Sequence, residues 1–296
     1  MAINGQRILI TGAARGIGAG SAKALAKRGA RVSLVGLEPE ELEKVAAECG
    51  PDAIWFEADI TDQDALDAAV EGTVEKFGGL DVVISNAGIG AGGPLQLMEQ
   101  DMWEKVVEIN LIGNVRTIRT CLPHIVESKG YVLPIASAAA IVHGPLMTAY
   151  CAAKAGLEAV GNGLRVEMKP HGVDVGVGYF SWIDTDMVSG GDEHPFFRKM
   201  RGELPGPMGK TYPLSDAVAA VVDGVEHRRR WVMAPKWLRA MFFLRGAVAA
   251  IDNKRIIKMM PEAEHAFREE IEAKGADASA PTGAGGAAAV RAHSAT

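Results

Sequence analysis

The hydrophobic positions of the chain fall into short continuous runs, separated by longer segments in which apolar residues recur at helical spacing. The continuous runs cover residues 7–10, 31–35, 53–56, 80–84, 131–135 and 173–179. The helical patterns cover residues 17–28, 39–49, 63–77, 99–127 and 148–168. Strands that are apolar throughout are typical of a parallel sheet covered on both faces. The alternation therefore predicts an α/β fold with a doubly wound parallel sheet, helices on both faces and ligands at the carboxyl ends of the strands.

Three segments depart from this alternation. Residues 184–210 contain five glycines and three prolines, which predicts a flexible flap over the substrate site. Residues 236–250 form a basic amphipathic helix that can pack on its own domain, cap the pocket, form a dimer contact or rest on a membrane surface. Residues 276–296 are rich in Ala, Gly and Ser, so we expect a disordered tail behind a single dinucleotide-binding catalytic domain over residues 1–275.

Composition and charge exclude several classes of protein. The 296 residues carry a net charge of −6, which indicates no surface for nucleic acid. Cys49, Cys121 and Cys151 are scattered, with no CxxC pair or metal-ligand spacing, so reduced thiols and a metal-free site are expected. The N-terminus lacks the apolar core of a signal peptide, and no apolar run approaches the roughly 20 residues that span a bilayer. We therefore expect a soluble cytoplasmic protein.

A glycine-rich turn joins the first predicted strand to the first predicted helix. It reads Thr-Gly-Ala-Ala-Arg-Gly-Ile-Gly over residues 11–18. Glycines accept backbone angles that a β-carbon forbids and let the main chain approach a pyrophosphate closely. The N-terminus of the following helix offers free N–H groups and the positive end of its dipole to the phosphates. In this strand–turn–helix context the pattern predicts a Rossmann-type dinucleotide site.

The spacing of these glycines resembles the short-chain dehydrogenase/reductase family, and further motifs match in order. Asp59 follows the third strand, where the family has an aspartate that contacts adenine, and Asn86-Ala87-Gly88 follows the fourth strand as in the family. The resemblance covers roughly residues 5 to 190. It implies a cofactor site made of Thr11, Gly12, Arg15, Gly16, Ile17, Gly18, Glu38, Asp59, Ile60, Asn86, Ala87, Gly88, Tyr150, Lys154, Ile183 and Thr185.

The choice between NAD and NADP depends on the end of the second strand. An acid at that position would bind the ribose 2′-hydroxyl and repel a 2′-phosphate, but Gly36 occupies it. Arg15 can meet a 2′-phosphate or remain a solvated surface residue. Leu37 stands where phosphate-binding relatives often carry arginine, and Glu38 adds negative charge. The sequence is therefore compatible with either NAD(H) or NADP(H), and Arg15 favours NADP(H).

The candidate catalytic residues are Asn110, Ser137, Tyr150 and Lys154, whose order matches the catalytic tetrad of the same family. Tyr150 and Lys154 are four residues apart, which places them on one face of a helix. Tyr150 would exchange a proton with the substrate oxygen, and Ser137 would hold that oxygen. A tyrosine pKa is ordinarily about 10, and the charge of Lys154 would lower it. The resemblance implies that Lys154 also holds the nicotinamide ribose and that Asn110 anchors a water.

The chain departs from the family pattern after the sixth strand. Phe180 and Ser181 replace the Pro-Gly pair of many relatives, whereas Thr185, which in relatives binds the nicotinamide carboxamide, is retained. Trp182 can line the pocket or belong to the core. His143 lies in the loop between Ser137 and Tyr150 and can contact substrate or stay on the surface. The expected substrate-binding residues are Ser137, His143, Tyr150 and Trp182.

These features favour an oxidoreductase acting on an apolar alcohol or ketone. Two alternatives use the same fold: a dinucleotide-sensing regulator and a protein associated with a membrane surface through residues 236–250. The helices around Asn110 and after Tyr150 carry apolar residues on several faces, and the resemblance implies that they pair in a homodimer or homotetramer.

Overall fold

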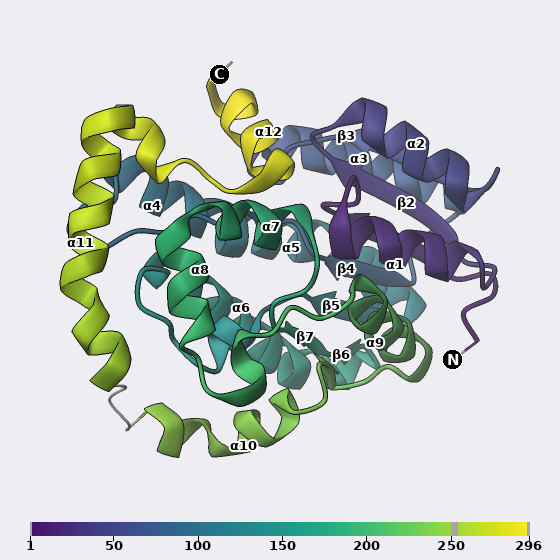
Figure 1. Cartoon of the computed structure of the whole chain (residues 1–296). Helices are drawn as coiled ribbons and strands as arrows, with labels where there is room; N and C mark the ends of the chain where they lie inside the picture. Colours follow the sequence, from purple (N-terminus) through teal and green to yellow (C-terminus); the bar gives the residue numbers. More distant parts are fainter. Residues whose placement is uncertain (1, 250–253, 295–296) are drawn as a thin grey trace.

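The computed structural model describes residues 2–249 and 254–294, which form a parallel sheet covered by helices (Figure 1). Six strands lie in the order β3-β2-β1-β4-β5-β6, all parallel. They are β1 (Arg7–Thr11), β2 (Arg31–Gly36), β3 (Ile54–Glu57), β4 (Val82–Ser85), β5 (Tyr131–Pro134) and β6 (Asp174–Val175). A second parallel pair, β7 (Val177–Phe180) and β8 (Trp231–Ala234), adjoins β5 through a bridge between Ile135 and Gly178. The predicted doubly wound α/β fold is confirmed.

The two faces of the sheet carry separate hydrophobic cores because alternate strand residues point in opposite directions. On β1, Ile8 and Ile10 pack into one core and Leu9 into the other, and all three are fully buried. The first core is covered by α1 (Gly16–Ala26), α2 (Pro39–Cys49) and α9 (Leu214–His227). The second is covered by α3 (Gln63–Phe77), α5 (Asn114–Ser128) and α6 (Thr148–Glu167). Burial on both faces explains why the central strands β1, β4 and β5 are apolar at their interior positions.

The helix expected over residues 99–127 is interrupted in the structure. It consists of α4 (Gln100–Val107), a π-helical segment η1 (Glu108–Gly113) and α5. Within the wide turn, the side-chain amide of Asn114 donates to the carbonyl of Ile109, five residues earlier, at 3.0 Å. π-Helical turns inside α-helices often lie at functional sites, and here the turn contains Asn110.

The strand expected over residues 173–179 is split at Gly176 into β6 and β7. A β-carbon on Gly176 would lie 2.2 Å from both the Tyr131 hydroxyl and the Arg229 carbonyl oxygen. Only glycine fits this close approach. Before Gly176 the chain pairs with β5 as strand β6, and after Gly176 it pairs with β8 as strand β7.

Nine further helical elements complete the part of the chain that the structure describes. They are η2 (Ala138–Ala140), η3 (Lys169–His171), α7 (Asp186–Glu193), α8 (Pro195–Gly202), η4 (Gly206–Gly209), α10 (Leu238–Ala249), α11 (Lys254–Lys274), η5 (Gly275–Ser279) and α12 (Gly283–Ser294). The expected flap over residues 184–210 contains α7, α8 and η4. The expected helix over residues 236–250 matches α10, although Ala250 lies outside the described residues. Within the described ranges, no helix is long and apolar enough to cross a membrane.

The structure contradicts the expected disordered tail over residues 276–296, because η5 and α12 occupy most of it. Residues 295–296 lie outside the described part. Alanine is the strongest helix former, and the small residues let this segment pack closely against α7. A β-carbon on Gly190 of α7 would lie 2.6 Å from the backbone nitrogen of Gly283. The small residues of this segment therefore serve close packing between α12 and α7, and their simple composition does not indicate disorder.

Candidate active site

A cavity of about 400 Å³ lies at the carboxyl ends of the strands, where the fold class places ligand sites. Its walls come from the turns after β1, β2, β3 and β4, the end of β5, the start of α6, and helices α7, α8 and α12. Of the residues expected to bind cofactor, all line this cavity except Thr11 and Gly18.

The glycine turn after β1 is shaped for close approach of a ligand. Gly12 and Gly16 have φ angles of 63° and 52°, which residues with a β-carbon rarely adopt. A β-carbon on Gly18 would lie 2.2 Å from the carbonyl oxygen of Gly12, so this position also requires glycine. The side chain of Arg15, the N-cap residue of α1, does not bond the first N–H groups of that helix. These N–H groups therefore remain open to an anion such as a pyrophosphate.

Thr11 and Asn86 connect the glycine turn to the end of β4. The Thr11 hydroxyl accepts hydrogen bonds from the backbone N–H groups of Asn86 at 3.0 Å and Ala87 at 3.2 Å. The Asn86 amide donates to the carbonyls of Thr11 at 3.0 Å and Gly12 at 3.2 Å. Thr11 is fully buried, so it positions the turn and does not line the cavity.

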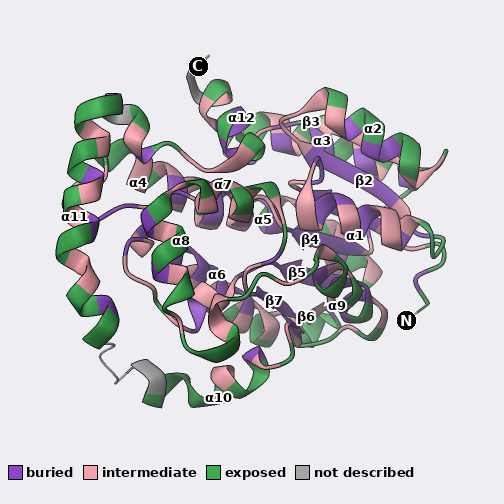
Figure 2. Ribbon diagram, in the orientation of Figure 1, coloured by how far each residue is buried: buried purple, intermediate pink, exposed green. Residues whose placement is uncertain are grey.

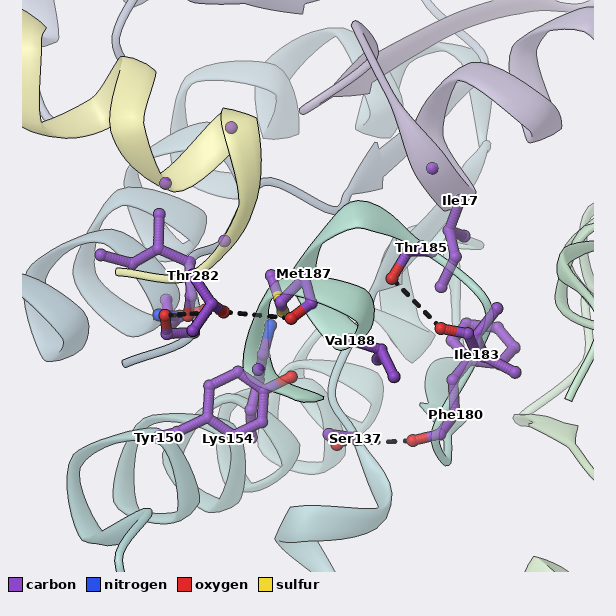
Figure 3. Close-up of a pocket in the computed structure, with 18 of the residues that line it drawn as sticks. Ile17, Ser137, Tyr150, Lys154, Phe180, Ile183, Thr185, Met187, Val188 and Thr282 are labelled. Carbon is purple, nitrogen blue, oxygen red and sulfur yellow. Dashed lines mark hydrogen bonds between the residues drawn. The ribbon is translucent and has the colours of Figure 1, made fainter. Parts of the chain in front are cut away.

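The structure brings the four candidate catalytic residues to one cavity, and Figure 3 shows Ser137, Tyr150 and Lys154 there. Ser137 follows β5, Tyr150 and Lys154 lie on the first turns of α6, and Asn110 lies in η1. The Ser137 hydroxyl accepts from the backbone N–H of Ala139 at 3.1 Å and donates weakly to the Phe180 carbonyl at 3.4 Å. The Lys154 ammonium lies 5.7 Å from the centre of the Tyr150 ring.

Lys154 and Asn110 are both buried and held by main-chain carbonyls. Lys154 Nζ donates to the Ile135 carbonyl at 2.9 Å, and the Asn110 amide donates to the carbonyls of Ile89 and Val106 at 2.9 Å each. Asn110 Oδ1 is buried and has no hydrogen-bond partner among the described residues. A β-carbon on Gly88 would lie 2.4 Å from this oxygen and 3.5 Å from Lys154 Nζ. Because residue 88 is glycine, the space next to Asn110 Oδ1 and the Lys154 ammonium is not filled by a side chain. Asn110 Oδ1 is therefore a polar acceptor with room for a partner.

Burial shifts the pKa values of Tyr150 and Lys154 in opposite directions. It raises the pKa of Tyr150 to about 12, and a hydrogen bond with Ser137 opposes this shift. It lowers the pKa of Lys154 to about 8. Desolvation disfavours the charged form of each group, which is the phenolate of tyrosine and the ammonium of lysine. At neutral pH Tyr150 therefore carries its proton and can donate it to a neighbouring oxygen.

Arg15 is surrounded by carboxylates. The sequence alone leaves open whether Arg15 binds a 2′-phosphate or remains a solvated surface residue. Its guanidinium lies 2.8 Å from Glu38, 3.5 Å from Asp186 and 4.0 Å from Glu41. Glu38 lines the cavity and its side chain is only 15% exposed. The positive charge of Arg15 is therefore opposed by three carboxylates in the region where the 2′-phosphate of NADP would lie.

The part of the cavity beyond Tyr150 is mostly apolar. Its apolar side chains are Val142, Met147, Phe180, Trp182, Met187, Val188, Phe197, Leu204, Met208, Trp237 and Leu238. The charged groups on this side are Asp192 and Arg201, which pair with each other at 2.5 Å. Arg201 also lies 5.4 Å from the centre of a Trp182 ring. Trp182 thus lies at the cavity, whereas His143 is exposed and outside the lining, so the structure does not support His143 as a substrate contact.

The loop and strand around these positions explain the difference between Trp182 and His143. The loop before α6 presents the neighbouring Val142 and Gly144 to the cavity and turns the His143 side chain to solvent. After β7, Ile183 pairs with Tyr212, and the Thr185 hydroxyl donates to the Ile183 carbonyl at 3.2 Å. This turn keeps Trp182, Ile183 and Thr185 on the cavity wall.

The C-terminal segment, expected to be a disordered tail, also contributes to the site. Thr282, Gly285, Gly286, Ala288 and Ala289 line the cavity. Thr282 is fixed there, because its N–H donates to the Gly90 carbonyl at 2.7 Å and its hydroxyl donates to the Met187 carbonyl at 3.0 Å (Figure 3). The alanine run over residues 287–289 was the available signal, since alanine favours helix.

The glycine turn after β1 opens into the same cavity as the half-buried Tyr150 and the buried Lys154. This combination defines a nicotinamide-dependent oxidoreductase. The family model for short chain dehydrogenases matches residues 6–195. The chain therefore belongs to the short-chain dehydrogenase/reductase family. The described residues contain no group of three or more His, Cys, Asp or Glu side chains placed to hold a metal ion.

Three similar proteins illustrate the match. The chain is 33% identical over 220 residues to trans-4-hydroxycyclohexanecarboxylate dehydrogenase of Sinomonas cyclohexanicum, covering 71% of this chain and 83% of that protein. The crystal structure of 3-ketoacyl-(acyl-carrier-protein) reductase from Brucella melitensis with NADH is 30% identical, with TM-score 0.70 over 76% of this chain and 93% of the other. A short chain dehydrogenase from Burkholderia cenocepacia in complex with NADP is also 30% identical, with TM-score 0.69 over 76% and 92%. The chain is thus similar to proteins that hold either cofactor.

Proposed function

We propose that this enzyme interconverts an apolar secondary alcohol and the corresponding ketone, with Tyr150 as the proton donor and acceptor. The observation that carries the proposal is the position of Tyr150, Ser137 and Lys154 on one largely apolar cavity that also contains the glycine turn. The residues present fit a dinucleotide, because the required glycines and the open N-terminus of α1 form its phosphate cradle.

Each residue has a distinct part in the proposed reaction. When bound, the nicotinamide supplies or accepts the hydride. In the reduction direction Tyr150 donates its hydroxyl proton to the substrate oxygen, and Ser137 holds that oxygen by a hydrogen bond. Lys154 holds the nicotinamide ribose and its charge lowers the pKa of Tyr150. Asn110 Oδ1, which is buried and unpaired among the described residues, anchors a water beside Lys154 for proton relay.

The cavity favours an apolar substrate. Its far side is formed by aromatic and aliphatic side chains, and the charges of Asp192 and Arg201 compensate each other. The similar enzyme from Sinomonas cyclohexanicum is named for a hydroxylated cyclohexane, which fits a cavity of this character. A screen of cyclic and long-chain alcohols and ketones, followed by the absorbance of reduced nicotinamide, tests this. Preferential turnover of phosphorylated or small, strongly polar substrates would argue against an apolar substrate.

We further propose that the enzyme prefers NAD(H) to NADP(H), although Arg15 considered from the sequence alone favours NADP(H). The doubly charged 2′-phosphate of NADP would approach one guanidinium already compensated by Glu38, Glu41 and Asp186. A carboxylate at Glu38 can instead accept a hydrogen bond from the ribose 2′-hydroxyl of NAD.

Replacing Glu38 with glutamine should raise kcat/KM with NADP(H) relative to NAD(H) by about tenfold, because the change removes the closest competing charge from Arg15. Glu40→Gln is the matched control, since Glu40 lies in the first turn of α2, two residues after Glu38, is exposed and does not line the cavity. Both cofactors should be compared at one ionic strength because salt screens exposed charges. A wild-type enzyme that prefers NADP(H) by more than about tenfold would contradict the proposal.

We also propose that the chain forms a homo-oligomer through the helices that carry the site. Two of its exposed large apolar side chains lie there, Ile112 in η1 and Val166 near the end of α6, with 38% and 65% exposure. Light scattering should therefore return a multiple of the 31.2 kDa chain mass, and Val166→Glu should lower it. A monomer at micromolar concentration would refute this expectation.

A further inference from the structure

The helix α10 has an apolar face that nothing in the described chain covers. Its inner side packs on the domain, where Leu238 is buried and Phe242 lies against Tyr179 and Trp231. Its outer side consists of exposed residues, most of them apolar: Arg239, Ala240, Phe243, Leu244, Gly246 and Ala247. In Figure 2, α10 lies at the edge of the molecule with much of its surface coloured as exposed.

Exposed apolar side chains concentrate in this part of the sequence. Six large apolar residues are exposed among the described residues, and three of them fall within residues 228–258: Phe243, Leu244 and Ile257. Phe243 and Leu244 are 65% and 57% exposed and are adjacent on α10. Exposed apolar patches of this kind on a folded protein mark a docking site more often than scattered single residues do.

The charge of the same segment is opposite to that of the whole chain. Residues 228–258 contain nine lysines and arginines against one aspartate, whereas the complete chain has a net charge of −6. Arg230, Lys236 and Arg239 are exposed immediately before and at the start of α10. Other basic side chains of the segment already have acidic partners, among them Arg228 with Asp174 and Arg245 with Glu158. The exposed cations therefore border the apolar face and are available to an anionic surface.

We propose that α10 docks on an anionic lipid surface, with Phe243 and Leu244 entering the boundary between headgroups and acyl chains. Apolar residues flanked by cations are the features of helices that lie in the plane of a membrane surface, where anionic lipids add electrostatic attraction. Docking of α10 on the same helix of a second copy would bring these cations together, and their repulsion disfavours such a contact.

The position of α10 connects the lipid surface to the active site. Trp237 and Leu238, directly before its outer face, line the cavity that contains Tyr150. This step rests on the proposed function: a lipid-soluble alcohol or ketone would reach the apolar side of the cavity from the membrane past these residues. The class of substrate is thereby narrowed to apolar compounds that partition into bilayers.

Sedimentation of the full chain with vesicles tests the docking without any measurement of turnover. We expect binding to phosphatidylcholine vesicles that contain phosphatidylglycerol, weak binding to phosphatidylcholine alone, and release by added salt. Phe243→Ser combined with Leu244→Ser should reduce the bound fraction by at least about tenfold. Leu95→Ser is the matched control, because Leu95 is 62% exposed and lies outside α10 and the cavity.

A second variant keeps the test decisive if the serine variant folds poorly, since Phe243 also contacts Trp231. Lys236→Glu combined with Arg239→Glu changes only exposed side chains and should abolish the preference for anionic vesicles. Absence of binding to anionic vesicles would overturn the proposal, as would binding that both variants leave unchanged. A serine variant that loses self-association, in a chain that binds no vesicles, would instead assign α10 to a contact between copies. Because binding is scored separately from activity, failure of the docking leaves the proposed reaction untouched.

Discussion

Replacing Tyr150 with phenylalanine should lower kcat by about a hundredfold or more and leave the dissociation constant of the dinucleotide nearly unchanged. The change removes one hydroxyl and preserves the packing of the ring on the cavity wall. In the structure burial keeps this hydroxyl protonated, with its pKa raised to about 12, so it is the available proton donor beside Ser137. Steady-state kinetics and cofactor titration by fluorescence measure the two quantities separately.

Tyr131→Phe is the matched control for this experiment. The Tyr131 hydroxyl is also buried and donates to the Arg229 carbonyl at 2.7 Å, but it lies outside the cavity. Its loss should reduce stability by about 1 kcal/mol and leave kcat unchanged. If Tyr150→Phe retained more than about a tenth of the wild-type kcat, Tyr150 would not be the proton donor.

Lys154→Met should affect both cofactor binding and proton transfer. We expect weaker dinucleotide binding, because Lys154 is proposed to hold the ribose, and a lower kcat in both directions. Oxidation requires Tyr150 without its proton, and the ammonium stabilises that form. The rise of the oxidation rate with pH should therefore move to higher pH in the variant. The readouts are the cofactor dissociation constant and the pH profile of kcat/KM.

Thermal unfolding separates this catalytic effect from a structural one. Burial lowers the pKa of Lys154 to about 8, so the charged lysine at pH 7 destabilises the folded chain relative to the unfolded one. The cost is greatest below pH 8 and fades as the pH rises toward the ordinary lysine pKa of about 10.4. Lys154→Met should consequently be at least as heat-stable as the wild type at pH 7. An unmoved pH profile with an unchanged cofactor affinity would remove Lys154 from the mechanism.

The central sheet was predictable because burial on both faces produces a local signal. Strands such as β1 and β4 are apolar at every interior position. The glycine turn was also predictable, because the backbone approaches its neighbours so closely at Gly12 and Gly18 that only glycine fits. The order of Asn110, Ser137 and Tyr150 along the chain also carried information, since it matches the order of the catalytic residues in the family that the chain resembles. These residues meet in one cavity in the structure.

Other features depend on contacts between distant segments and leave no local signal. The environment of Arg15 includes Asp186, which is far away in sequence, so its charge could not be judged from the turn alone. The π-helical turn at Asn110 accommodates Gly113 against Ile60, where a β-carbon would lie 2.7 Å away. The simple composition of residues 276–296 predicts disorder, although the small residues of α12 allow close packing on α7.

The central claim is that the cavity transfers a hydride between a nicotinamide and a carbonyl carbon while Tyr150 exchanges the proton. The most direct test uses NADH in which both hydrogens at C4 of the nicotinamide are replaced by deuterium, together with a ketone that the wild type turns over. The alcohol product is analysed by mass spectrometry. We predict one deuterium at the carbinol carbon with the wild-type enzyme and almost no product with Tyr150→Phe. Tight binding of the dinucleotide without deuterium transfer to any ketone would contradict the account and would favour a cofactor-sensing role for this fold.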